Sequence, residues 1–239
     1  TIPRELFYDY GSGTHPALGG TATLVYDTAA RQLVQSSLSL IGTMRNCAGG
    51  QTPWGTWITC EESVVTAGEQ LERNHGYCFE VPATTEMRVH PPVRLTEMGR
   101  FYHEAVAVDR RTGIVYLTED RHDSLLYRFL PVEPGNLSAG GRLQALAVRA
   151  RPCADTRNYA PGTFPRATQL KCRWIDLEDV KSPNDDLRAQ GFAKGAAQFS
   201  RGEGIWATPD GIFFACTEGG AEHGGQVFRL LVGHGGVGG

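Results

Sequence analysis

The sequence predicts an all-β protein built as a β-propeller, and three observations lead to that fold class. Glycine accounts for 30 of the 239 residues, about twice the usual ~7%, and without a collagen period this excess indicates many tight turns. Short runs rich in β-branched and aromatic residues recur along the chain, whereas helical periodicity is weak throughout. One layout of strand, turn and acidic residue occurs three times, which is typical of a radial array of sheets.

The strand signal lies in short runs that are bounded by Gly, Pro, Asp or Asn. Examples of these runs are Ala22–Tyr26, Gln32–Leu40, Thr56–Cys60, Ala105–Asp109, Ile114–Thr118, Leu125–Leu130, Ile212–Cys216 and Gln226–Leu231. We expect short helices at Asp176–Val180 and Asp185–Gln190. The stretch from Arg151 to Phe199 lacks a strong strand, so we interpret about 151–199 as a long insertion, which often borders a site.

In the repeated layout, a potential metal ligand precedes a turn glycine, a strand and a closing acid. The first unit runs from Cys47 to Glu62, the second from Glu104 to Asp120, and the third from Glu203 to Glu218. A further strand with aromatic residues follows each unit after a polar gap. We therefore expect antiparallel meanders, each forming one sheet of the array.

The spacing of the units predicts the number of sheets. Glu61 and Glu119 are 119 − 61 = 58 residues apart, and Glu119 and Glu218 are 218 − 119 = 99 apart. The second interval is roughly twice a blade of ~45–50 residues. We therefore expect one further blade between the second and third units, and at least four four-stranded sheets in all.

Radial repetition should gather the acids of the three units on one face, near the central channel. A pool of carboxylates repels itself unless cations compensate, and oxygen ligands suit Ca²⁺, Mg²⁺ or Mn²⁺. Cys47 is the exception, because a thiolate binds iron or zinc well and Ca²⁺ poorly. The alternative to a metal-binding role for the acids is that they are ordinary solvated residues at strand ends. The alternative for Cys47 is a small buried residue beside the Gly49–Gly50 turn.

Arg201 stands two residues before Glu203, and residues i and i+2 of an extended strand point to the same side. One of them can therefore bind metal while the other offers a planar guanidinium group to a phosphate. The alternative for Arg201 is a surface salt bridge, which contributes little to stability.

Charge and length narrow the function classes. The chain has 23 Lys and Arg against 26 Asp and Glu, a formal charge of −3, so we do not expect nucleic-acid binding. No run of apolar residues is long enough for a transmembrane helix. No leader pattern opens the chain, so we expect any signal peptide to be absent already. We expect residues 1–239 to form a single β-propeller domain or a fragment of one, of unknown oligomeric state.

The six cysteines do not make a disulfide scaffold in a chain of this length. Cys153 and Cys172 flank a loop rich in Pro, Arg and Asn, where a bridge is plausible. Cys60 and Cys216 lie inside apolar strand patterns, so we expect buried, inert thiols there.

Three blocks of the chain resemble, in order, motifs of the PhoX-type alkaline phosphatases. The first is NCAGGQTPWGTWITCEE, from Asn46 to Glu62. The second is FYHEAVAVDRRTGIVYLTEDR, from Phe101 to Arg121, and the third is RGEGIW, from Arg201 to Trp206. The resemblance extends over roughly Gly19 to Leu230 and is weakest across the insertion.

This resemblance implies a β-propeller, six-bladed in the full family, with a mixed Fe³⁺ and Ca²⁺ cluster on the channel axis. It also implies hydrolysis of small-molecule phosphate monoesters in the periplasm or outside the cell. By motif position, Cys47 is an iron ligand and Arg201 holds the substrate phosphate. The other metal ligands implied are Glu62, Glu119, Asp120 and Glu203, with Glu61 and Glu104 as less direct transfers.

The chain departs from the family pattern in two places. It contains no upstream Asn-His-Glu motif, and no further acidic strand end follows the third unit before the tail Val232–Gly239. We therefore expect a fragment or a shortened member. Two other functions stay open: a non-catalytic calcium-stabilised propeller that binds a partner, and a lactonase-like hydrolase with one divalent cation. Cys47 argues against both, because neither needs a thiolate.

Overall fold

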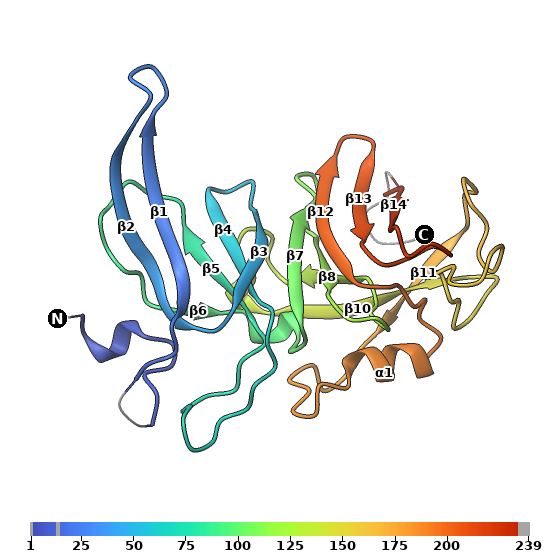
Figure 1. Ribbon diagram of the computed structural model, residues 1–239, viewed down its shortest axis with the longest axis horizontal. Coiled ribbons are helices and arrows are strands. Elements are labelled where there is room, and N and C mark those ends of the chain that lie inside the picture. Colours follow the sequence, from blue (N-terminus) through green and yellow to red (C-terminus); the bar gives the residue numbers. More distant parts are fainter. Residues whose placement is uncertain (1, 13–14, 234–239) are drawn as a thin grey trace.

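The computed structural model describes residues 2–12 and 15–233, which form four antiparallel sheets (Figure 1). The first sheet is a hairpin that projects from the molecule and consists of β1 (Gly19–Asp27) and β2 (Gln32–Thr43). The second contains β3 (Asn46–Gln51), β4 (Thr56–Glu61), β5 (Cys78–Pro82) and β6 (Val93–Arg94). The third contains β7 (His103–Val108), β8 (Val115–Glu119), β9 (Tyr127–Pro131), β10 (Gly141–Val148) and β11 (Cys172–Asp176). The fourth contains β12 (Gly202–Thr208), β13 (Gly211–Cys216) and β14 (Gln226–Leu230).

Helices are short in the described ranges. They are the 3₁₀ turns η1 (Arg4–Leu6), η2 (Thr96–Met98) and η3 (Leu137–Ala139), and the α-helix α1 (Leu187–Ala193). Among the described residues no helix is long and apolar enough to cross a membrane. The all-β prediction is confirmed, and every predicted strand run overlaps an observed strand.

Three finer expectations were wrong. The sheets have two, four, five and three strands rather than four each. The blade expected between the second and third units is missing, because β10 pairs with β9 and β11 with β10, so both strands extend the third sheet. The helix expected at Asp176–Val180 is instead the end of β11 and a loop, whereas α1 overlaps the second expected helix.

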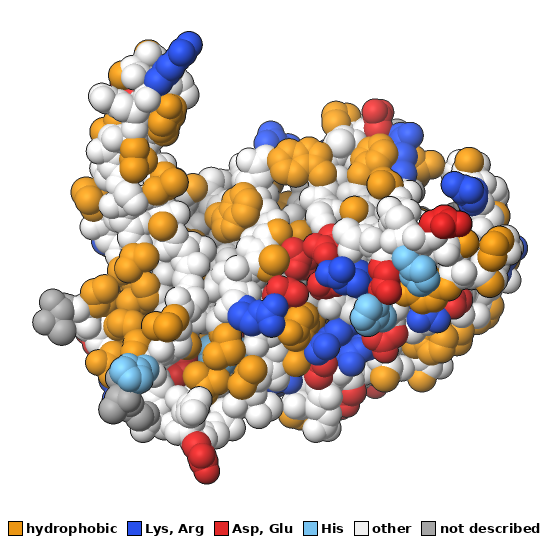
Figure 2. Space-filling model, viewed as in Figure 1, with side chains coloured by type: hydrophobic (Ala, Val, Ile, Leu, Met, Phe, Trp, Pro, Cys, Tyr) orange, Lys and Arg blue, Asp and Glu red, His pale blue; other side chains and the backbone are white. Residues whose placement is uncertain are grey.

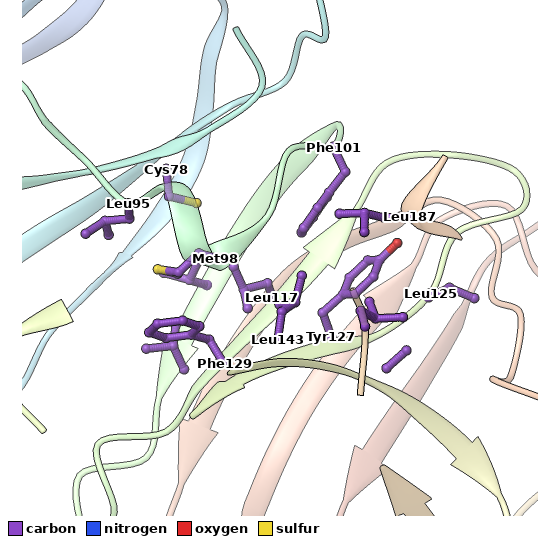
Figure 3. Close-up of a cluster of buried hydrophobic side chains, with 14 of the residues drawn as sticks. Cys78, Leu95, Met98, Phe101, Leu117, Leu125, Tyr127, Phe129, Leu143 and Leu187 are labelled. Carbon is purple, nitrogen blue, oxygen red and sulfur yellow. The ribbon is translucent and has the colours of Figure 1, made fainter. Parts of the chain in front are cut away.

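The core lies between successive sheets, and β7 shows how the sequence builds it. Side chains alternate faces along a strand, and both faces of β7 are buried. Val106 and Val108 enter the cluster that packs against the second sheet, in which Figure 3 shows Met98, Phe101 and Leu117. Ala105 and Ala107 enter the cluster shared with β12–β14. This face-to-face packing of neighbouring sheets is the arrangement of blades in a β-propeller.

The cysteine expectations had mixed outcomes. All six cysteines are free, so Cys153 and Cys172 form no bridge. Their thiols donate to different backbone carbonyls, those of Phe192 and Leu170. Cys60 and Cys216 are fully buried, as predicted.

Candidate metal centre

The same irregularity interrupts the first hairpin of the second, third and fourth sheets. Asn46 pairs with Glu61 and Gly49 with Thr59, so β3 advances three residues while β4 advances two. At the equivalent point, β7 is shifted against β8, and β12 against β13. Each shift is a β-bulge, which re-aims side chains and is frequent next to active sites. The residues placed in the bulges include Cys47, Glu104 and Glu203.

A backbone hydrogen bond beside each bulge shows which residues are equivalent. The N–H groups of Glu62, Asp120 and Thr217 donate to the carbonyl oxygens of Arg45, Tyr102 and Arg201, at 3.0, 3.1 and 3.0 Å. Thr217 therefore takes the position of the closing acid in the third unit, and Glu218 lies one residue beyond it. The repeat read from the sequence is real, but its third member is offset by one residue.

The three bulges meet because β7 lies between β3 and β12 (Figure 1). Gly50 permits the close approach of β3, since a Cβ at that position would lie 2.1 Å from the Val106 carbonyl oxygen. On the other side, the Thr118 hydroxyl donates to the Glu203 carbonyl oxygen at 2.6 Å. Figure 2 shows acidic and basic side chains gathered on this face, where Figure 1 draws the lower ends of β7 and β12.

A thiol and two carboxylates form the centre of this group. The Cys47 thiol donates to Glu104 Oε1 at 3.0 Å. Ligand atoms of Cys47, Glu62 and Glu104 all lie within 4.8 Å of one another. Glu104 comes from β7, whereas Cys47 and Glu62 come from the β3–β4 hairpin, so packing between two sheets assembles the group.

Electrostatics shows that the group carries excess negative charge. Burial raises the pKa of Glu104, and repulsion by Glu203, Glu62 and Asp120 raises it further. The hydrogen bond from Cys47 acts to lower the same pKa but does not cancel the rise. Partial burial and the neighbouring Glu104 and Glu62 raise the pKa of Cys47 to about 12. The thiol is thus protonated at neutral pH in the metal-free protein, and a metal ion would have to displace that proton.

Arg201 supplies positive charge to the same group. Its Nε and Nη2 donate to the two Asp120 oxygens at 2.8 and 2.9 Å, and Nη2 also donates to Glu203 at 3.0 Å. These bonds, Asp120 above all, raise the pKa of Arg201. Its backbone is left-handed, with φ of 50°, which is a costly conformation for a non-glycine residue at a bulge.

The structure does not bring the Glu61 and Glu119 carboxylates to this group. Glu61 is fully buried and bonded to His75 and to backbone N–H groups. Glu119 is also fully buried, where it accepts bonds from the Tyr127 hydroxyl and the Leu125 N–H. Burial raises the pKa of Glu119 to about 7, although Arg188 acts to lower it. The side chains of Glu119 and Asp120 thus point to opposite sides, as expected for neighbouring residues at the end of a strand. Glu119 lies in the core and Asp120 contacts Arg201.

The structure adds residues that the sequence interpretation missed. Arg45 contacts Glu62 at 3.3 Å and the Tyr102 hydroxyl at 3.3 Å. The repeat contained the signal, since Arg45 precedes Cys47 by two residues as Arg201 precedes Glu203. From the stretch 151–199, the Tyr159 hydroxyl lies 2.5 Å from the hydroxyl of Ser200, the residue that precedes Arg201 in the chain.

The donor set fits metal ions. Carboxylate oxygens are the ligands of hard cations such as Ca²⁺, and a thiolate suits iron. The group has four carboxylates and two guanidinium groups: Arg45 contacts Glu62, and Arg201 contacts Asp120 and Glu203, with Glu104 bonded to Cys47. Further positive charge would therefore relieve the repulsion.

Comparison with known proteins identifies the family. The family model described as alkaline phosphatase PhoX matches residues 12–232. The chain belongs to the PhoX family. A structure of Pseudomonas fluorescens PhoX in complex with vanadate, a transition state analogue, is similar with a TM-score of 0.55 and 21% sequence identity.

That similarity covers 87% of this chain and 49% of the Pseudomonas fluorescens chain, so this chain spans about half the length of that PhoX structure. No curated protein matches this chain. The similarity confirms the β-propeller fold class, and the family match confirms the resemblance read from the three motif blocks.

Proposed function

We propose that the protein is a metal-dependent alkaline phosphatase that hydrolyses phosphate monoesters at the group formed by Cys47, Glu62, Glu104, Asp120, Glu203 and Arg201. The observation that carries this proposal is the meeting of one thiol and four carboxylates beside Arg201 in a chain of the PhoX family. A purely calcium-stabilised module would have no use for the thiol at the centre of such a group.

We assign Fe³⁺ to Cys47 and Ca²⁺ to the carboxylate positions, and Glu104 would serve as a ligand beside Cys47. Cys47 is the soft donor and Glu104 accepts its hydrogen bond, so the two side chains would bind the same or adjacent ions. Glu62, Asp120 and Glu203 offer hard oxygen atoms, which calcium prefers. Glu61 and Glu119 are left out of this ligand set, because both are buried with other partners.

Arg201 is assigned to the substrate phosphate. Its Nε and Nη2 are engaged by Asp120 and Glu203, whereas Nη1 makes no hydrogen bond within the described ranges. Asp120 therefore orients the guanidinium group, and Nη1 is left to donate to a phosphate oxygen. When bound, the metal ions would neutralise the phosphate oxygens and activate an oxygen nucleophile. Arg201 would strengthen its bond as charge builds on the transferred group.

The test combines metal analysis with an activity assay. We expect the purified chain to contain iron and calcium and to hydrolyse p-nitrophenyl phosphate, with activity lost on chelation and inhibition by vanadate. Cys47→Ser should lower iron content and rate together. Cys153→Ser is the matched control, because Cys153 is also exposed but its thiol donates to the Phe192 carbonyl oxygen. Hydrolysis that persists without metal, or full iron content in Cys47→Ser, would contradict the assignment.

We propose that the protein acts in the periplasm or outside the cell. A ferric and calcium centre that hydrolyses small phosphate esters fits the periplasm or the extracellular space, where esters are scavenged. Cell fractionation of the producing organism checks this, and recovery of the protein with cytoplasmic markers alone would contradict it.

A further inference from the structure

Cys60 and Cys78 face each other across the two central strands of the second sheet. They are register partners on β4 and β5. The N–H of Glu61 donates to the Tyr77 carbonyl oxygen at 3.1 Å, so the cysteines occupy a non-hydrogen-bonded pair, where the side chains of opposite residues lie closest. Their sulfur atoms are 3.6 Å apart.

The surroundings hold both thiols in this position. Each cysteine is completely buried, and Figure 3 shows Cys78 beside Leu95 and Met98. The Cys78 sulfur also lies 3.3 Å from His103 Nδ1, and His103 Nε2 lies 3.0 Å from the Gly99 carbonyl oxygen. That carbonyl requires a proton on Nε2, so Nδ1 is the acceptor and the Cys78 thiol points toward it.

The alternative of a metal site at these soft donors is not favoured. A metal site needs at least three ligand atoms from His, Cys, Asp or Glu close together. In residues 2–12 and 15–233, such atoms lie within 4.8 Å of one another in the group of Cys47, Glu62 and Glu104. The ligand atoms of His103 and the two cysteines do not all lie this close to one another. Cys216 is equally buried but lies on the fourth sheet, so it serves as a natural comparison.

We propose that Cys60 and Cys78 form a disulfide bond across β4 and β5 when the chain folds in the presence of a disulfide oxidant. Opposite residues of a non-hydrogen-bonded pair have Cα atoms about 4.5 Å apart, within the range of disulfides at about 4.4–6.8 Å. The sulfurs have to approach from 3.6 Å to about 2.05 Å. Rotation of the side chains toward each other supplies this movement.

The reaction is a thiol–disulfide exchange. The sulfur of one cysteine attacks an external disulfide such as oxidised glutathione. This forms a mixed disulfide between the cysteine and one glutathione, and the other glutathione leaves as a thiol. The other cysteine then attacks the mixed disulfide and releases the second glutathione thiol. Two electrons and two protons pass from the cysteine pair to glutathione. Because both thiols are buried in the folded chain, the exchange takes place while the strands are still open.

The link would close the segment between β4 and β5, which begins with Glu61 and Glu62. Cross-linking residues 18 apart in sequence restricts the unfolded chain, and a chain of this size gains roughly 5–10 °C in melting temperature from such a loop. The inference does not depend on the proposed phosphatase activity.

The experiment refolds the full chain in glutathione buffers rich in the oxidised or the reduced form, blocks free thiols, and maps peptides by mass spectrometry. We expect a Cys60–Cys78 peptide that is lighter by two hydrogen atoms in the oxidised sample, together with a higher melting temperature. Cys60→Ser should abolish both differences, whereas the control Cys216→Ser should keep them. If either variant fails to fold, the wild-type map decides alone. Natively folded protein with six free thiols, or Cys60 linked to another cysteine, would overturn the proposal.

Discussion

Replacing Glu61 by glutamine tests whether this carboxylate holds the fold or a metal ion. Its Oε1 accepts hydrogen bonds from the Met44 N–H at 2.9 Å and from His75 Nδ1 at 2.7 Å. Its Oε2 accepts from the N–H groups of Gly76 at 2.8 Å and Tyr77 at 3.2 Å. The site is fully buried, so water cannot replace a lost partner.

The cost of Glu61→Gln follows from this arrangement. Turned toward Gly76 and Tyr77, the NH₂ group of glutamine faces two backbone N–H donors. Turned the other way, it faces the Met44 N–H and has to displace the proton of His75 Nδ1. A buried donor left without an acceptor costs about 1–3 kcal/mol, so the free energy of unfolding should fall by roughly 2–5 kcal/mol. For a chain of this length that corresponds to a melting temperature lower by roughly 5–15 °C.

The adjacent residue supplies the control. Glu62 has a partly exposed side chain bonded to Arg45, so Glu62→Gln should change stability by less than about 1 kcal/mol and lower metal content instead. Thermal melts and elemental analysis of both variants separate the two roles. If Glu61→Gln melts like the wild type but loses metal, the structural role inferred for Glu61 is refuted.

Three further predictions concern other parts of the molecule. Arg201→Lys should reduce kcat by about 10²–10³ with little loss of stability, because lysine cannot keep the paired bonds to Asp120. Glu203→Gln should reduce metal content as well as kcat. An unchanged kcat in Arg201→Lys would show that Arg201 is not part of the site. Burial acts to lower the pKa of His75, but Glu61 and Asp9 outweigh burial and raise that pKa. The stability that His75 contributes is therefore complete below about pH 6.5 and is lost as pH rises through the raised pKa. Thermal melts across this pH range should show the decline in the wild type and not in His75→Gln. Gly50→Ala should destabilise the fold by about 1–3 kcal/mol and weaken metal binding, because the new methyl meets the Val106 carbonyl oxygen, whereas Gly68→Ala, which has open space around it, should do neither.

The sequence by itself determined the fold class and the outline of the site. Short runs rich in β-branched and aromatic residues and bounded by turn residues mark strands, and all the predicted runs overlap strands. The repeat placed Cys47, Glu104 and Glu203 at equivalent positions because each unit carries the same hairpin with the same bulge. The number of strands per sheet was not readable, because nothing local distinguishes a strand that extends a sheet, such as β10, from one that begins another.

Tertiary structure decided which acids join the site. Glu61 and Glu62 are neighbours of the same type, and a shift of one residue in register exchanges the faces on which they lie. The pairing of Glu61 with Asn46 and its burial against His75 turn that carboxylate inward and leave Glu62 beside Cys47. In the same way the meeting of Cys60 with Cys78 depends on the register of β4 and β5, because residues far apart in sequence become opposite partners only when long-range backbone pairing is complete.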